Sequence, residues 1–235
     1  MTASKPEPET ERLYLEELAR RAAAVLGDEL VGVYAGGSFA LGGYEPGRSD
    51  LDVAVVVESG LAAEQRSGLI EQVRHESLPC PARGLELVVY RRAIAASPRP
   101  ARDFELNLNS GAAMPLLLET EPGGGPDFWF PIDRSILAQA GVAILGPPAD
   151  QVFAQVPPEE LRLALEESDE WHRANREADS ERNRARAMRF LREGRWCSKQ
   201  QAWRWAADQT LTRRLNEAST SSGKPGTSSR SSTEE

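Results

Sequence analysis

The spacing of apolar residues changes from helical to strand-like and back along the first part of the chain. Between Thr10 and Leu26 these residues recur at the i, i+3, i+4 and i+7 positions of an amphipathic helix, and Gly27 stands where such a helix commonly ends. Shorter apolar runs bounded by Gly, Pro, Ser or Asp are typical of strands. The pattern predicts a small α/β domain with a mixed sheet, with helices at 10–26 and 61–74 and strands at 30–34, 51–57 and 84–90.

Proline and glycine interrupt the middle of the chain, whereas the residues beyond Pro158 follow a helical pattern that predicts an all-helical bundle. The final residues, rich in Ser, Thr and Gly, cannot bury enough apolar surface to order themselves. The elements predicted in this part are strands at 104–108 and 142–145, a loop at 121–126, and helices at 131–140, 158–173, 180–194 and 198–213. The predicted fold is therefore α/β (α+β), divided into a disordered lead-in (1–9), an α/β domain (10–150), a C-terminal helical domain (151–215) and a disordered tail (216–235).

The balance of charge argues against a nucleic-acid partner. Lys and Arg number 28 against 36 Asp and Glu, which gives a formal net charge of −8, whereas phosphate backbones are normally met by a basic surface. A cationic or neutral small molecule is the expected partner. Cys80 and Cys197 do not have metal-ligand spacing, and no apolar run approaches the ~20 residues that span a bilayer. Because the polar amino end lacks the apolar core of a signal peptide, the protein is expected to be cytoplasmic and without membrane attachment. It is also expected to be a monomer.

Two carboxylates, Asp50 and Asp52, are separated by one residue at the start of a strongly apolar strand. Because side chains of a strand alternate between its faces, both carboxylates point to the same side. Like charges on one face repel, and a bound Mg²⁺ removes that conflict because this ion prefers hard oxygen ligands. The alternative is a surface-facing pair at a sheet edge.

A glycine-rich turn precedes these acids. Gly37 and Ser38 lie where the first strand ends and a short helix is expected to begin. Glycine lets the backbone approach a ligand closely, and the Ser38 hydroxyl can donate to a phosphate oxygen. The turn is not a Walker A loop, because no Gly-Lys-Ser/Thr follows it. An ordinary strand-to-helix turn is the other interpretation.

Glu86 is a third acid, within the apolar strand at 84–90. If this strand lies beside the strand at 51–57, Glu86 faces the same side as Asp50 and Asp52. Three such carboxylates could hold two Mg²⁺ ions, or two could bind metal while Glu86 acts as the general base. The sequence leaves this choice open.

Combined, these residues resemble the signature of polymerase-β-like nucleotidyltransferases, which here reads Gly36-Gly37-Ser38, then Ser49-Asp50-Leu51-Asp52, then Glu86. Segments at 103–107, 141–148 and 191–205 are further similar to the aminoglycoside 3″/9-adenylyltransferase family. The resemblance implies a nucleotidyltransferase domain followed by a helical bundle. It also implies AMP transfer from ATP to a hydroxyl of streptomycin or spectinomycin, with two Mg²⁺ ions as cofactor. Ser49 is added to the nucleotide-binding residues by the same resemblance.

The same resemblance gives roles to residues of the helical part. Arg186 and Lys199 match the Arg and Lys with which the family contacts ATP, although either residue also fits a solvated helix face. Trp171, His172 and Asp179 lie in or beside an acidic helical stretch that is expected to line the site of a cationic acceptor. Plain helix surface is the alternative for this stretch.

One departure from the family bears on the acceptor. Members that accept streptomycin carry a Trp shortly after the Glu-Leu segment, whereas this chain has Asn-Ser-Gly-Ala at 109–112, with Trp129 as a substitute. Spectinomycin is therefore favoured over streptomycin, and antibiotic resistance is the expected role. Three alternatives stay open: a toxin-like nucleotidyltransferase acting on a protein or tRNA, a non-catalytic nucleotide-binding sensor, and a hydrolase that uses the same acids.

Overall fold

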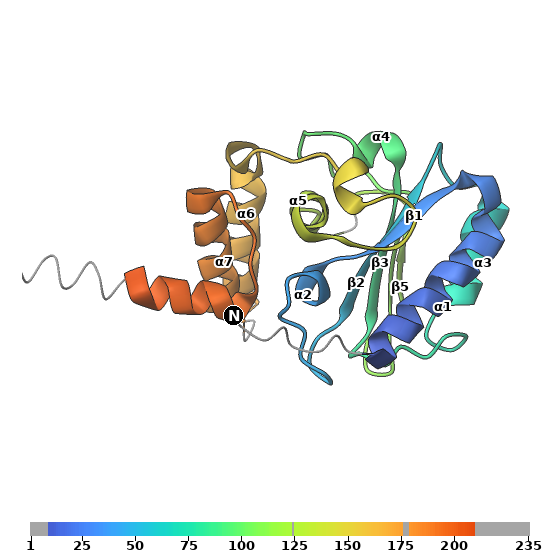
Figure 1. Cartoon of the computed structure of the whole chain (residues 1–235), viewed down its shortest axis with the longest axis horizontal. Coiled ribbons are helices and arrows are strands. Elements are labelled where there is room, and N and C mark those ends of the chain that lie inside the picture. The colour runs from blue at the N-terminus through green and yellow to red at the C-terminus, as the bar shows by residue number, and fades with distance from the viewer. Residues whose placement is uncertain (1–8, 124, 176–178, 210–235) are drawn as a thin grey trace, which may run out of the picture.

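A six-stranded sheet forms the centre of the molecule (Figure 1). The computed structural model describes residues 9–123, 125–175 and 179–209. The spatial order of the strands is β5-β4-β3-β2-β1-β6. Their bounds are β1 Leu30–Ala35, β2 Leu51–Val57, β3 Leu85–Arg91, β4 Leu106–Ser110, β5 Leu117–Glu119 and β6 Val142–Leu145.

The sheet is mixed, as predicted. Strands β2 and β3 are parallel, and every other neighbouring pair is antiparallel. A parallel pair requires a crossover, which helix α3 (Ala63–Val73) supplies between the two strands. The crossover lets β2 and β3 begin at the same edge of the sheet, so that the residues at their amino ends become neighbours.

The two faces of the sheet carry different helices. Helices α1 (Glu9–Leu26) and α3 cover one face, and α5 (Trp129–Ala140) covers the other (Figure 1). The buried side of α1 is the apolar stripe predicted from its spacing, with Leu15, Leu18 and Ala22 among its buried residues. On β2, the side chains alternate between the two cores, so one face of this strand is left for α5.

The helical part packs against α5 rather than against the sheet. It contains α6 (Pro158–Ala174), α7 (Ser180–Glu193) and a further helix described over 199–209 (Figure 1). Phe190 of α7 stacks on Trp196, with ring centroids 4.1 Å apart, and both belong to a core that includes Ile136 of α5. The division into two domains at residue 150 stays a prediction. No helix in the described ranges is long and apolar enough to cross a membrane.

Several local predictions were wrong. The helix predicted from residue 10 already includes Glu9, and the strand predicted at 104–108 is displaced to β4 because Phe104 packs into the α5 side of the core. Strand β5 was not predicted, since its three residues are ordered by pairing with the edge of β4. Helix α4 (Arg92–Ala95) was also missed. The remaining lead-in and the tail at 216–235 lie outside the described residues.

Candidate active site

The three predicted acids lie together at the amino ends of β2 and β3. Asp52 is the direct register partner of Glu86 across the parallel pair, and Asp50 immediately precedes β2. Leu51 and Val53 point into the core beneath α1 and α3, so the alternating Asp52 faces the side of α5. The expected proximity of the three carboxylates is confirmed, while their catalytic roles stay predictions.

The glycine-serine turn wraps around Asp52. Gly36 donates its backbone N–H to the Asp52 carbonyl oxygen at 2.8 Å, and the Ser38 N–H donates to the Asp52 carboxylate. Gly37 begins the short helix α2 (Gly37–Ala40) with a φ of +48°. The Ser38 hydroxyl is buried and has no hydrogen-bond partner in the described part of the chain. A buried hydroxyl without a partner can donate a hydrogen bond to a phosphate oxygen.

Burial and mutual repulsion make this cluster a poor place for negative charge. Burial, followed by the charge of Asp50, raises the pKa of Asp52 to about 6, although Arg186 and Lys199 oppose the rise. Burial and then the charge of Asp52 hold the pKa of Glu86 well above its ordinary value. A cation bound here would be stabilised by the same charges that repel one another.

A fourth acid in the cluster, Asp133 of α5, was missed by the sequence interpretation. It lies one helical turn before Leu137, which packs close to Gly36 on the acid-bearing face of the sheet. Burial raises the pKa of Asp133 to about 8, with the next contribution from Asp52. The available signal was the charged pair Asp133-Arg134 inside an otherwise uncharged helix.

Cations approach the acids from two directions. Arg83, in the loop before β3, pairs with Asp50 at 2.5 Å. From α7, the half-buried Arg186 interacts with Asp133 and Asp52, and burial lowers its pKa. Its guanidinium carbon lies 5.8 Å from the ring centroid of Trp196. The interpretation of Arg186 as solvated helix surface is therefore wrong.

Two other predicted residues of the site are already engaged. Lys199 binds Asp179 through a 3.2 Å contact between Nζ and Oδ2, and Arg182 pairs with the other oxygen of the same carboxylate. Asp179 therefore lies beside a predicted nucleotide contact. The Ser49 hydroxyl accepts the Glu45 N–H at 3.0 Å, so it closes the turn before β2.

The remaining acceptor candidates belong to an aromatic cluster between α5 and α6. Trp129 and Trp171 are half-buried and meet edge to face, with centroids 5.3 Å apart. His172 is buried beside both rings, and its Nδ1 lies 2.7 Å from the Ser168 carbonyl oxygen. The exposed parts of the two tryptophans are therefore better placed than His172 to meet an acceptor.

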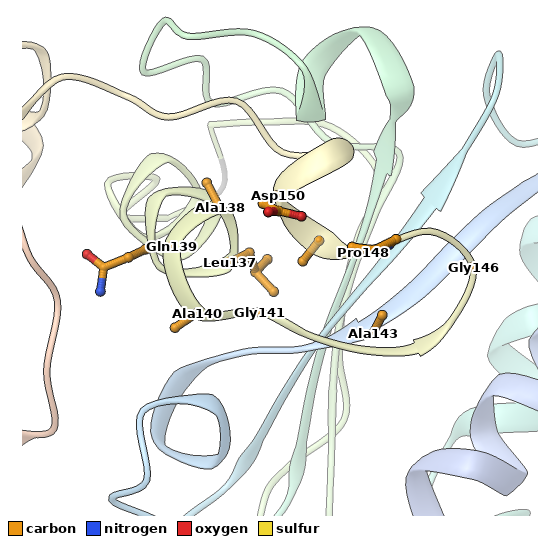
Figure 2. A pocket seen from close by; sticks show the side chains of 10 residues that line it. Leu137, Ala138, Gln139, Ala140, Gly141, Ala143, Gly146, Pro148 and Asp150 are labelled. Atoms are coloured by element: carbon orange, nitrogen blue, oxygen red, sulfur yellow. The ribbon is translucent and has the colours of Figure 1, made fainter.

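A hollow of about 460 Å³ lies elsewhere, between the end of α5 and the Gly-Pro-Pro segment (Figure 2). Its lining includes Leu137, Gly141, Gly146 and Pro148, and Asp150 is the one ionisable side chain among its lining residues. The hollow contains none of the predicted site residues. The acid cluster, and not this hollow, is the candidate active site.

Similarity to known proteins agrees with that location. Residues 15–87 match the family described as a nucleotidyltransferase domain. This part of the chain is therefore similar to a nucleotidyltransferase domain. The matched range includes the glycine-serine turn, Asp50, Asp52 and Glu86, and it supports a transferase enzyme.

A solved structure extends the likeness over most of the chain. It is the crystal structure of spectinomycin adenyltransferase AAD(9) from Enterococcus faecialis with ATP and spectinomycin. The TM-score is 0.60 with 18% sequence identity, and the match covers 91% of each chain. This confirms the expected resemblance at the level of the fold. No protein of curated function matches the chain.

Proposed function

We propose that this nucleotidyltransferase transfers AMP from ATP to a hydroxyl of an aminoglycoside or aminocyclitol, acting as a cytoplasmic monomer. The observation that carries the proposal is the meeting of Asp50, Asp52 and Glu86 on one face, beside the glycine-serine turn. Hydrolases and sensors do not need a phosphate turn and a repulsive acid cluster in the same place.

Magnesium fits the chemistry of the donors. Asp50 and Asp52 offer hard carboxylate oxygens, and the charge of Asp50 disfavours the ionised form of Asp52. In the described ranges, no three His, Cys, Asp or Glu side chains already surround one point as a ligand set. We therefore assign Asp50 and Asp52 as the ligands that would hold Mg²⁺, whose chemistry is to neutralise the triphosphate and the charge of the transition state.

The chain's own groups have distinct tasks in this reaction. The Ser38 hydroxyl and the Gly37 backbone anchor the β- and γ-phosphates. Arg186 and Lys199 assist them as positively charged contacts to the nucleotide. The acceptor hydroxyl then attacks the α-phosphorus in line, and pyrophosphate leaves. Glu86 either accepts the hydroxyl proton or completes the metal shell, and its raised pKa suits the first role.

Spectinomycin is the favoured acceptor. AAD(9), which shares the fold, was crystallised with ATP and spectinomycin. In the present chain β4 ends with Asn109 and Ser110 and is followed by Gly111, so the stacking Trp of streptomycin-accepting relatives is missing from this position. Trp129 and Trp171 supply aromatic surface from α5 and α6 instead.

The test is pyrophosphate release from Mg-ATP with spectinomycin, streptomycin, other aminoglycosides or no acceptor. Release with spectinomycin alone supports the full proposal. Asp50→Asn should abolish the release with little loss of stability, while Asp28→Asn, an exposed acid in the turn before β1, should keep full rates. ATP binding without release in the presence of any drug would overturn the small-molecule acceptor and favour a protein, a tRNA or a sensor.

A further inference from the structure

Arg83 reaches a carboxylate that the proposed metal site also needs. Its Nη2 lies 2.5 Å from Oδ2 of Asp50. The pairing is built into the backbone, because the Arg83 N–H donates to the Ser49 carbonyl oxygen at 3.0 Å and the Leu51 N–H donates to the Gly84 carbonyl oxygen at 2.9 Å. These two bonds fix the loop before β3 against the start of β2, which keeps the guanidinium beside the acids.

The charge of Arg83 acts on more than one acid. Besides its contact with Asp50, it is close enough to Glu86 to oppose the rise of that pKa. Asp52 instead has Arg186 and Lys199 as its nearby cations. Arg83 is thus the cation that pairs directly with Asp50, whereas Arg186 and Lys199 act on Asp52.

We propose that Arg83 competes with the divalent cation for Asp50 and is displaced when the metal arrives together with the triphosphate. This inference rests on the proposed function, since it needs Asp50 as a ligand. A cation that binds Oδ2 must break the Arg83 contact and bear repulsion from the guanidinium at short range. The affinity of the protein for the metal alone is therefore lowered.

The exposure of Arg83 permits the exchange. Its side chain is 54% exposed, against 23% for Asp50, so it can leave the carboxylate without opening the core. Oxygens of a triphosphate are strong partners for a guanidinium and would replace Asp50. Because the nucleotide gives Arg83 a new partner, nucleotide and metal should each strengthen the binding of the other.

A matched ion pair lies at the opposite end of the same two strands. Arg92, just after β3, binds Glu58, just after β2, at 2.8 Å, and the two side chains are 51% and 52% exposed. Arg92→Gln removes the same charge and a comparable surface contact without touching the acid cluster. It therefore controls for net charge and for the loss of an exposed pair.

The experiment measures Mn²⁺ binding by calorimetry in the wild type, Arg83→Gln, Arg92→Gln and Asp50→Asn, each with and without a non-hydrolysable ATP analogue. Without nucleotide, Arg83→Gln should bind Mn²⁺ about five-fold more tightly than the wild type, the size expected for losing an exposed ion pair as competitor. The analogue should then strengthen Mn²⁺ binding less in this variant than in the wild type. Arg92→Gln should match the wild type.

The opposite sign overturns the inference. If Arg83→Gln binds Mn²⁺ as tightly as the wild type, Arg83 does not compete for the site, and if it binds more weakly, Arg83 supports the site. The proposed function survives that result when the wild type binds Mn²⁺ and Asp50→Asn does not. If the wild type fails to bind Mn²⁺ even with the nucleotide analogue, the metal site and the role of Arg83 are both wrong.

Discussion

Gly37 and Asp52 are in contact where β1 gives way to α2, so closely that a Cβ atom at position 37 would collide with Oδ2 of Asp52. The hydrogen bonds from Gly36 and Ser38 to Asp52 flank this contact. The backbone of the turn therefore sets the direction of the carboxylate. A phosphate-binding turn and a metal ligand are positioned by one short piece of chain, which ties the two halves of the proposed chemistry together.

Gly37→Ala should therefore lose pyrophosphate release by about a hundred-fold or more, since a displaced catalytic group commonly costs that much. Its left-handed φ of +48° adds a stability cost of about 1–2 kcal/mol. Gly42→Ala is the control, because Gly42 has a φ of +66° and no atom within 4 Å of a Cβ. Both variants should lose stability in urea unfolding, Gly37→Ala by more because of its collision with Asp52, and only Gly37→Ala should lose activity. Equal activities would contradict the role of the contact.

The acid cluster should make the stability of the metal-free protein depend on pH. The folded-state pKa is about 6 for Asp52 and about 8 for Asp133, both raised from 3.8. Between about pH 4 and 8 the folded state then binds more protons than the unfolded state, so these groups lower the free energy of unfolding as pH rises. Thermal unfolding in EDTA should show this decline, and Mg²⁺ should reduce it.

Asp133→Asn isolates one of these groups. The variant should melt several degrees above the wild type at pH 8, and the difference should shrink toward zero near pH 4, where Asp133 is protonated in both states. Asp150→Asn, an exposed acid in η2 (Ala149–Gln151), should show no such pattern. A gain that is equal at both pH values would indicate simple packing and not relief of charge.

Arg134 should be a strong structural determinant of the α5 side. Its side chain is 1% exposed, and its guanidinium donates to the carbonyl oxygens of Ile94, Ser97, Arg99 and Ala101. Arg134→Met leaves these part-buried acceptors without their donor and should cost about 3 kcal/mol.

The control for urea unfolding of Arg134→Met is Arg162→Met. Because Arg162 is exposed on α6, its replacement should change the free energy of unfolding by no more than about 0.5 kcal/mol. The β3–β4 loop should also become a site of limited proteolysis in Arg134→Met. If Arg134→Met unfolded at the same urea midpoint as the wild type, the four carbonyl oxygens would have found other donors.

Arg186→Met tests the cation that α7 brings to the acids. Methionine keeps apolar contact with Trp196 but removes the charge near Asp52. ATP affinity should fall about ten-fold or more, the size of a charge-assisted hydrogen bond. Arg184→Met removes an exposed charge on the same helix and should bind ATP as the wild type does. Equal affinities in a fluorescent ATP-analogue titration would remove Arg186 from the nucleotide site.

The strand assignments show how far local spacing reaches. The bounds predicted for β2 agree with the structure, and alternation along this strand placed Asp50 and Asp52 on one side. The strand predicted at 104–108 is displaced because Phe104 packs into the core, whereas the omission of β5 has another cause. A short edge strand gains its order from its neighbour, so its own residues carry little information about it.

The sequence by itself determined most of the longer elements and three of the four acids, because backbone periodicity is a local property that a run of residues encodes directly. Only the tertiary structure decided which groups surround them: Asp133 from α5, Arg83 from the loop before β3 and Arg186 from α7. It also buried His172, which the sequence offered as a contact for the acceptor. Such neighbours depend on how whole helices pack on a sheet, and that packing is fixed by the sum of many distant apolar contacts that no local pattern contains.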